Sequence, residues 1–429
     1  MNLKEDLQSR GFVYQYSDEK VFDIYNKWWE TFYIWFDPSA DSLHLGNFCG
    51  IMLAINLMKY WNKCYFLSGW ATGMIWDPGG KDAERSFLDE QTLEKNTNAI
   101  SRQLQHIVDH VSQMTGKKME FDFVNNYDFF KDMNFLWFLR EVGKYMTVNQ
   151  MMAKETVKKR IEDPDKSISY TEFSYMLLQG YDFYRLFSDK WAKLQIWWSD
   201  QWWNLITWVE LIRKKLDKEA YVITLPLLVD STGKKFWKSE WNAIWLDKNK
   251  NSPYFVYQYF INTADQDIEK FLKILTLLTF EEINEIVSKH NDAPEQRYWQ
   301  KQLAKSIIKT IFTDDDANQC EEIAEILFGK EDKLEILKKM SEVDIKALYR
   351  ETWWVEIQSF EKNILDICVE TGLSTSKWEA KKLISEWGLS LNENKITDLN
   401  FSISEKDFIS WKVCLLKKGK KVFKLILKK

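Results

Sequence analysis

The chain has 429 residues, of which 45% are hydrophobic and 29% charged, and its formal net charge is −5. This composition is typical of a globular protein and excludes an intrinsically disordered one; the length suits two to four domains. The N-terminal MNLKEDLQSRG does not resemble a signal peptide, and no apolar run approaches the roughly 18 residues of a membrane span. We therefore expect a cytoplasmic protein without membrane contact.

The numbers and positions of cysteine, histidine and lysine indicate the redox compartment, the absence of an expected metal site and the kind of partner. The five cysteines lie far apart without a CxxC pair, which favours a reducing compartment over a disulfide framework or a zinc site. His106 and His110 share a helix face at i, i+4 spacing, but with only four histidines we expect no dedicated metal site. Residues 412–429 contain eight lysines and no acid, which favours a polyanionic partner.

In chain order, short apolar runs alternate with helical stretches through the first half. The apolar runs predict strands at 31–36, 64–69, 118–126, 193–196 and 220–229, and the stretches between them predict helices that include 43–60 and 205–216. This alternation predicts a parallel sheet with helices on both faces, which binds its ligands at the carboxyl ends of the strands.

The second half follows a different pattern. From about residue 248 to 348 the periodicity is helical, and the last 70 or so residues combine a basic amphipathic helix, a short strand and the lysine-rich end. We expect three modules: an α/β domain, a helical domain and a small basic α+β domain.

Glycine and tryptophan numbers are unusual. The chain has 22 Trp and 15 Gly, whereas a chain of this length ordinarily carries about 30 Gly and only a few Trp. The excess of one residue nearly matches the deficit of the other. The stretch LQIWWSDQWWN (194–204) concentrates the anomaly, with two tryptophan doublets around a polar Ser-Asp-Gln.

Five motifs, in this order, resemble those of the bacterial tyrosyl-tRNA synthetases. They are FDPSADSLHLGN (36–47), ATGMIWDPGGKDAER (71–85), SYTEFSYMLLQGYDF (169–183), LQIWWSDQWWN (194–204) and KKFWKSEWNAIWLD (234–247). The resemblance implies a Rossmann-like class I catalytic domain with a parallel sheet over 1–230, a KMSKS-type loop and linker over 231–247, an α-helical anticodon-arm domain over 248–350, and a linker with a small α+β RNA-binding domain and basic tail over 351–429.

The resemblance also implies the chemistry and the residues that perform it. The carboxylate of L-tyrosine would attack the α-phosphate of ATP, accompanied by Mg²⁺, and the tyrosyl group would then pass to tRNA(Tyr). The tyrosine-binding residues would be Tyr33, Asp77, Tyr175, Gln179, Asp182 and Gln201. The ATP-binding residues would be Asp37, Ser39, His44, Gly46, Asp200 and Lys238. Catalytic charge would come from His44, Lys81, Arg85, Lys235 and Lys238. The family further implies a homodimer formed through the catalytic domain.

The sequence departs from the family motifs in one consistent way: tryptophan stands where the family has glycine. In the site these positions are Trp35, Trp70, Trp76, Trp197, Trp198, Trp203 and Trp237. Outside it they include Trp208 and Trp241 and, less securely, Trp61 and Trp387, while Trp28, Trp29, Trp191, Trp353, Trp354, Trp378 and Trp411 stand where a turn glycine would be natural. Trp202 and Trp245 match tryptophans of the family. Glycine is used where the backbone needs a positive φ or where a ligand must approach it closely. An indole at such a position would clash with its surroundings.

We therefore hypothesise that the gene uses UGA as a glycine codon and was translated with a table that reads UGA as tryptophan. A chain that carries these tryptophans is expected to be inactive. Three alternatives stay open. One is a tryptophan-type synthetase of the same subclass. Another is a Trp-rich, non-enzymatic protein that binds carbohydrate or lipid, and a third is an RNA-binding protein without activation chemistry.

Overall fold

A computed structural model of the chain describes residues 1–27, 29–75, 88–152, 155–163, 167–229, 231, 233, 243–328, 334, 337, 354–357, 362–409, 413–419 and 422–428. Two compact units emerge from it. The first comprises Met1–Asn251 with Phe260–Ile311, and the second Ser252–Tyr259 with Phe312–Lys429. The predicted domain boundaries stay predictions, although the first unit joins helices up to Ile311 to the α/β part.

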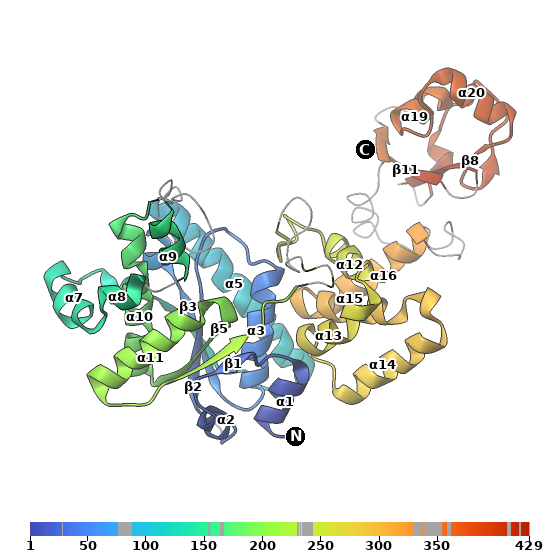
Figure 1. Cartoon of the computed structure of the whole chain (residues 1–429). Helices are drawn as coiled ribbons and strands as arrows, with labels where there is room; N and C mark the ends of the chain where they lie inside the picture. Colours follow the sequence, from blue (N-terminus) through green and yellow to red (C-terminus); the bar gives the residue numbers. More distant parts are fainter. Residues whose placement is uncertain are drawn as a thin grey trace. The chain divides into compact units, whose positions relative to one another are not determined.

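The first unit is built on a six-stranded sheet in the order β1-β6-β5-β2-β3-β4 (Figure 1). Its strands are β1 Gln15–Tyr16, β2 Thr31–Phe36, β3 Lys63–Ser68, β4 Phe121–Asn125, β5 Ala192–Trp198 and β6 Tyr221–Leu225. All pairings are parallel except that of β1 with β6 at one edge. The predicted mostly parallel sheet is thus confirmed.

Several strand ends differ from the sequence prediction, since β4 starts only at Phe121 and β3 is shifted by one residue, and two of the differences lie near the site. The last strand stops at Leu225 instead of continuing to 229, because Pro226 has no N–H to donate to a neighbouring strand. The 193–196 strand instead runs on to Trp198, so that Trp197 pairs with Thr224 and Trp198 with Leu225. The first tryptophan doublet is therefore strand and not loop.

The connections place a topological switch point between β2 and β5. From β2 the chain winds outward through β3 to β4, and it then returns to pair β5 on the other side of β2. Crossovers that leave two neighbouring strands in opposite directions open a crevice at their carboxyl ends, where such sheets bind ligands.

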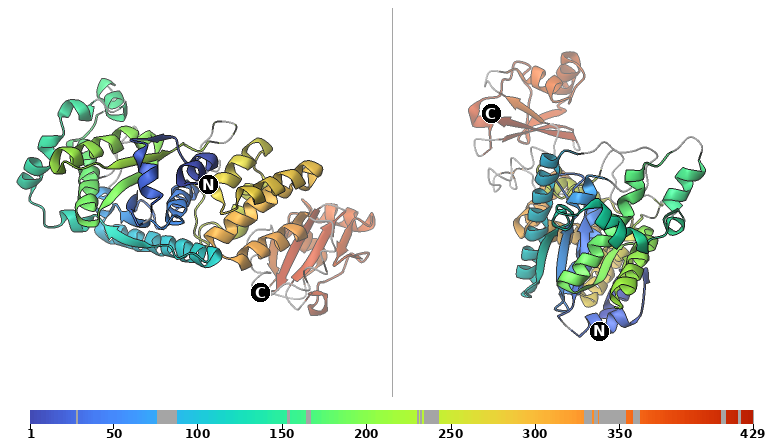
Figure 2. Two further views of the ribbon diagram at one scale, coloured as in Figure 1. Left: turned by 90° about the horizontal axis from the view of Figure 1, so that it is seen from below. Right: turned by 90° about the vertical axis from the view of Figure 1, so that its left-hand side faces the viewer.

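Helices cover both faces of the sheet (Figure 2). In the α/β part they are α1 Leu3–Arg10, α2 Lys20–Tyr25, α3 Leu45–Met58, α4 Trp70–Gly73, α5 Glu90–Thr115, α6 Tyr127–Phe130, α7 Phe135–Glu141, α8 Val148–Met152, α9 Glu155–Glu162, α10 Tyr170–Lys190 and α11 Trp202–Leu216, with the 3₁₀ turns η1 Gly143–Tyr145 and η2 Ser199–Gln201. Almost every residue of α3 is buried against β2, β3 and β5, whereas α10 packs on α11 and β5.

The remaining helices of the first unit follow α12 Pro253–Ile261, which spans both units. They are α13 Asp265–Leu275, α14 Phe280–Asp292, η3 Pro294–Gln296 and α15 Tyr298–Ile311. α13, α14 and α15 pack on one another, and α13 also packs on α3. Buried Arg10 joins the two parts, because it pairs with Asp6 at 2.9 Å and donates to the carbonyl oxygens of Lys273 and Leu278.

The second unit contains a smaller sheet in the order β7-β11-β10-β8-β9. Its elements are α16 Asp314–Phe328, β7 Trp354–Ile357, α19 Ile364–Glu370, α20 Lys377–Ser385, β8 Leu389–Leu391, β9 Asn394–Lys395, η4 Glu405–Asp407, β10 Val413–Lys418 and β11 Val422–Lys428. Only the β7–β11 pairing is parallel. α19 and α20 share an aliphatic core with this sheet, which confirms the predicted α+β module. None of the helices among the described residues is long and apolar enough to cross a membrane.

Candidate active site

One face of α10 carries three polar side chains into the protein interior. Tyr175, Gln179 and Asp182 are spaced by four and three residues, so they lie on the same side of the helix. All three are at least 96% buried. The helix starts at a capping box of Ser169 and Glu172, which fixes its first turn and hence the depth of this face.

Facing them is Tyr33, in the middle of β2. Its ring is almost fully buried, and its hydroxyl donates to Gln195 Oε1 on β5 at 3.0 Å. Tyr33 and Gln195 are register partners in the parallel ladder, so the sheet itself brings them together. Burial, and then the negative charge of Asp182, raise the pKa of the Tyr33 hydroxyl well above its usual range.

A chain of hydrogen bonds links these residues to the loop after β2. The Tyr175 hydroxyl donates to Asp37 Oδ2 at 3.1 Å, and the Thr72 hydroxyl donates to Asp37 Oδ1 at 3.1 Å. The Asn126 side-chain amide donates both to Thr72 Oγ1, at 3.3 Å, and to Asp182 Oδ2, at 3.0 Å. The structure thus joins Asp37 of the 36–47 motif to Tyr175 and Asp182 of the 169–183 motif.

Asn126 and Thr72 are residues that the sequence-based site did not include. Asn126 stands at the N-terminus of α6, where an asparagine often caps the helix. In the structure it is fully buried and makes no helix-capping bond, while its Oδ1 accepts from the Ala71 N–H at 2.7 Å. Its position directly after β4, at the carboxyl edge of the sheet, was the only available signal.

Asp182 is held in an unusual state for a carboxyl group. Burial, together with the charge of Asp37, raises its pKa well above the usual value, and the hydrogen bond from Asn126 opposes this increase only in part. Oδ1 of Asp182 is buried and has no hydrogen-bond partner among the residues that the structure describes. Gln179 Oε1 is likewise buried without a partner. Unsatisfied polar atoms of this kind are costly unless a ligand supplies the missing bond.

His44 stands at the N-terminus of α3, at the end of the same loop. Its Nδ1 accepts from the Asn47 N–H at 3.3 Å, while Asn47 Oδ1 accepts from the His44 N–H at 3.0 Å, which completes a capping box. Because Nδ1 is an acceptor here, a neutral imidazole carries its proton on Nε2. Gly46 lies buried in the first turn, where backbone N–H groups favour anions.

Other predicted binding residues lie at or near the protein surface. Ser39 and Asp200 are exposed, and Gln201 Oε1 accepts from the Asn204 side chain at 2.6 Å. Asp77, Lys81, Arg85, Lys235 and Lys238, together with Trp76 and Trp237, lie outside the described residues. Their roles stay predictions.

Tryptophans occupy the switch point itself. Trp35 at the end of β2 stacks on Trp197 at the end of β5, with 4.4 Å between ring centroids and 28° between planes. Trp35 also lies 6.4 Å from the Tyr33 ring. The buried indole of Trp70, after β3, contacts Tyr127 at 4.3 Å. Aromatic rings therefore fill the crevice where a sheet of this type receives its ligand.

Backbone conformation singles out further tryptophans. Among the described residues, eight that are not glycine have positive φ, and four of these are tryptophans, namely Trp29, Trp61, Trp191 and Trp387 with φ of 64°, 68°, 57° and 58°. Outside glycine, this left-handed region is occupied mostly by Asn and Asp and is unfavourable for a bulky side chain. All four side chains are exposed, so burial does not compensate the strain.

Comparison with known proteins defines first the class of the fold. The family model of the class I tRNA synthetases for tryptophan and tyrosine matches residues 30–329, and the C-terminal domain model of tyrosine–tRNA ligases matches residues 344–426. The doubly wound sheet with its His44-capped helix is therefore the catalytic domain of a class I aminoacyl-tRNA synthetase.

Individual relatives narrow the class. The chain is 41% identical over 423 residues to tyrosine–tRNA ligase 1 of Streptococcus thermophilus (strain CNRZ 1066), which is 98% of each chain. It is 40% identical over 428 residues to tyrosine–tRNA ligase of Streptococcus suis (strain 98HAH33), or 99% of this chain and 100% of that one. A truncated mitochondrial tyrosyl-tRNA synthetase of Aspergillus nidulans superposes with a TM-score of 0.70 at 27% identity, covering 76% of this chain and 94% of that one. The chain belongs to the tyrosyl-tRNA synthetase family.

Proposed function

We propose that this chain activates L-tyrosine with ATP to tyrosyl-adenylate and pyrophosphate, and then transfers the tyrosyl group to tRNA(Tyr). The observation that carries the proposal is the buried, unpartnered Oδ1 of Asp182 on the face of α10 opposite Tyr33. We expect a phenolic hydroxyl to bind between these two groups. Phenylalanine would leave them unsatisfied in a dry site, and the tyrosyl-tRNA synthetases are themselves the standard example of this discrimination.

The polar face of α10 would hold the rest of the amino acid. Tyr175 and Gln179, with Asp77, would bind the α-ammonium group, and Gln201 would lie near the carboxylate. Gln179 supports this role because its Oε1 is a buried acceptor that lacks a donor. Groups fixed in this way act by position and charge, without a covalent intermediate.

The nucleotide would lie across the N-terminus of α3. The Nε2–H that follows from the His44 capping box would donate to the ATP phosphates, Gly46 would let adenine approach the backbone, and Asp37, Ser39 and Asp200 would bind around the ribose and amino group. Lys81, Arg85, Lys235 and Lys238 would hold the departing pyrophosphate. Mg²⁺ would arrive on the ATP phosphates and need no protein cage of its own.

We further propose that the functional protein has glycine where this chain has tryptophan at the positions identified in the motifs. Three observations support this. Trp35 and Trp197 fill the ligand crevice, four other tryptophans lie at positive φ, and the Trp208 ring presses so closely on Gly180 that a Cβ there would lie 1.8 Å from Trp208 Cε3. A UGA codon read as glycine would explain all three at once.

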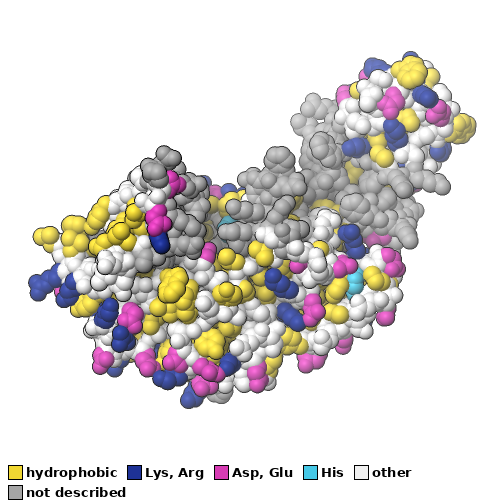
Figure 3. Space-filling view, viewed as in Figure 1, with side chains coloured by type: hydrophobic (Ala, Val, Ile, Leu, Met, Phe, Trp, Pro, Cys, Tyr) yellow, Lys and Arg dark blue, Asp and Glu magenta, His cyan; other side chains and the backbone are white. Residues whose placement is uncertain are grey.

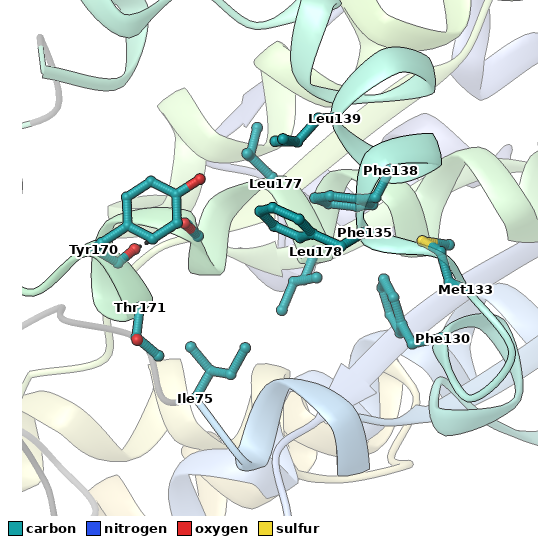
Figure 4. A pocket seen from close by; sticks show the side chains of 11 residues that line it. Ile75, Phe130, Met133, Phe135, Phe138, Leu139, Tyr170, Thr171, Leu177 and Leu178 are labelled. Atoms are coloured by element: carbon teal, nitrogen blue, oxygen red, sulfur yellow. Dashed lines mark hydrogen bonds between the residues drawn. The ribbon is translucent and has the colours of Figure 1, made fainter.

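The functional unit proposed is a homodimer. Along α7 and its neighbours the large apolar side chains face outward, with Phe135 61% and Leu136 73% exposed (Figure 3). Phe135 borders a pocket lined mostly by apolar residues, into which Phe138 and Leu177 also project (Figure 4). An apolar surface of this kind suits a second copy of the chain.

The C-terminal module, with lysines on α20 and at the chain end, would contact tRNA phosphates.

Pyrophosphate exchange tests the proposal directly. The chain as written and a chain with glycine at Trp35, Trp70, Trp76, Trp197, Trp198, Trp203 and Trp237 would be compared with tyrosine and with tryptophan as substrate. We expect exchange with tyrosine in the glycine chain and none in the other. Exchange with tryptophan instead would favour the related synthetase, and no exchange in either chain would refute the enzymatic proposal. UGG at codons 197, 198, 203 and 237 of the gene would refute the glycine hypothesis.

A further inference from the structure

Gln195 lies behind the proposed tyrosine pocket and is assigned no role so far. It is the register partner of Tyr33 in the β2–β5 ladder, and its side chain is fully buried. Its two polar atoms have different partners: Oε1 lies 3.0 Å from the Tyr33 hydroxyl, and Nε2 lies 2.8 Å from the carbonyl oxygen of Leu205 on α11.

The direction of these hydrogen bonds follows from the partners. A carbonyl oxygen can only accept, so the Leu205 carbonyl requires the amide nitrogen of Gln195 and fixes the orientation of the amide group. Oε1 of Gln195 then faces Tyr33, and it too can only accept. The single hydrogen of the Tyr33 hydroxyl is therefore committed to Gln195, and only the lone pairs of its oxygen are left for a ligand.

We propose that Gln195 is a positioning residue that sets substrate specificity, because it makes Tyr33 a hydrogen-bond acceptor toward the para position of the bound ring. The inference rests on the proposed function and refines it. Asp182, whose buried Oδ1 lacks a hydrogen-bond partner among the described residues, is the other group proposed to contact the para substituent. At the Tyr33 oxygen, a para substituent with a hydrogen to donate is favoured over one that can only accept.

The proposal predicts an order among tyrosine analogues of similar size. Tyrosine and 4-aminophenylalanine carry a hydrogen on the para atom and bind. 4-Fluorophenylalanine presents only lone pairs to the Tyr33 oxygen and binds much more weakly. A pocket selective by shape alone would treat fluorine, which is smaller than a hydroxyl group, as readily as it treats tyrosine.

Gln195→Met tests this in the full-length chain, in whichever form activates tyrosine. Methionine has a similar length but leaves the Tyr33 hydrogen free to point at the ligand. We expect the KM for tyrosine to rise by about tenfold to a hundredfold, as for loss of one buried hydrogen-bond partner. We also expect the preference for tyrosine over 4-fluorophenylalanine to fall at least tenfold. Gln195→Glu, which as a neutral acid keeps both bonds, should preserve the order of analogues.

Two controls separate this role from a merely structural one. Gln300→Met makes the same change at another buried glutamine, whose Nε2 donates to Asp265 Oδ1 on neighbouring α13, and should leave the order of analogues unchanged. Tyr33→Phe combined with Gln195→Met should cost no more than Tyr33→Phe alone, because Gln195 acts through Tyr33.

The outcomes distinguish this inference from the proposed function. If the parent chain binds tyrosine but Gln195→Met keeps its preference, or if the double variant is additive, the inference is wrong and the function stands. If no form of the chain binds tyrosine, both fail together. Should Gln195→Met not fold, the Gln195→Glu variant decides, since a changed order of analogues there also overturns the proposal.

Discussion

Trp35 and Trp197 stack on each other at the carboxyl ends of β2 and β5, with their ring centroids 4.4 Å apart. The two strands are neighbours at the point where the crossovers of the sheet change direction. Trp35 is only 6% exposed, so its indole is part of the core. Its ring centroid lies 6.4 Å from that of Tyr33. The two stacked indoles therefore occupy space at the proposed tyrosine site.

Replacing both residues of this stack by glycine should open the pocket. We expect Trp35→Gly with Trp197→Gly to give measurable tyrosine binding in equilibrium dialysis, and a rise in melting temperature with tyrosine, because ligand binding stabilises the folded state. Trp202→Gly, at a tryptophan that the family shares, is the control and should give neither effect. Tyrosine binding by the unaltered chain that equals that of the double variant would contradict the prediction.

Glycine at the exposed tryptophans with positive φ should stabilise the protein. Trp191 ends α10 in the left-handed region with φ of 57°. We expect Trp191→Gly to raise the free energy of unfolding by about 1 kcal/mol, since the left-handed conformation costs an L-residue roughly 1–2 kcal/mol and glycine recovers most of it. Urea denaturation measures the change.

Trp378→Gly is the matched control for this stability effect. Trp378 does not lie in a turn, as the sequence suggested, but in the first turn of helix α20, where φ is helical, and it is at least as exposed as Trp191. Glycine there should leave the free energy of unfolding unchanged or lower it by up to about 1 kcal/mol. Equal stabilisation at both positions would show that removal of an exposed indole, and not backbone strain, is the cause.

Asn126 should matter for catalysis although it faces Asp182 and not the nucleotide. Asn126→Ala removes the donor 3.0 Å from Asp182 Oδ2, and leaving a buried polar atom without its partner costs about 1–3 kcal/mol. We expect kcat/KM for tyrosine activation to fall by about tenfold to a hundredfold. Asn125→Ala, which removes a turn bond to the Tyr127 N–H, serves as the control. A loss of the same size there would point to general damage at the end of β4.

Asp182 should make stability depend on pH in a predictable direction. Its pKa is raised in the folded protein, so the native state keeps a proton that the unfolded chain releases. The free energy of unfolding therefore falls as pH rises from the unfolded pKa, near 4, toward the raised folded pKa. Asp182→Asn removes this contribution, so the variant should gain stability over the parent as pH increases through that range. Urea titrations at several pH values measure the difference, and a constant difference would contradict it.

Self-association is expected to depend on the apolar side chains of α7. Phe135→Asp places a charge at an apolar residue that is 61% exposed and should shift the protein from dimer to monomer in sedimentation velocity. Tyr14→Asp changes an equally exposed aromatic residue far along the chain and should leave the dimer intact. A monomeric parent, or a dimer that survives Phe135→Asp, would argue against this surface.

The sequence alone determined the class of fold, the family and the position of the anomalous tryptophans. Strand and helix periodicity and the order of the five motifs can be read directly from the sequence, and its composition shows an excess of tryptophan beside a deficit of glycine. The sequence also nominated Tyr175, Gln179 and Asp182 through the 169–183 motif, and Tyr33 through the resemblance to the family.

Only the tertiary structure decided which of these groups touch. Asp37 and Tyr175 are hydrogen-bonded although they are 138 positions apart in the sequence, and Gln195 and Tyr33 although they are 162 positions apart. Strand order and register bring these distant segments side by side. The sequence missed Asn126, Thr72 and Gln195 for the same reason: each is an ordinary polar residue until its burial and its partners are known. Backbone angle, likewise, is a property of the folded chain, and Trp29, Trp61, Trp191 and Trp387 have positive φ, which favours glycine.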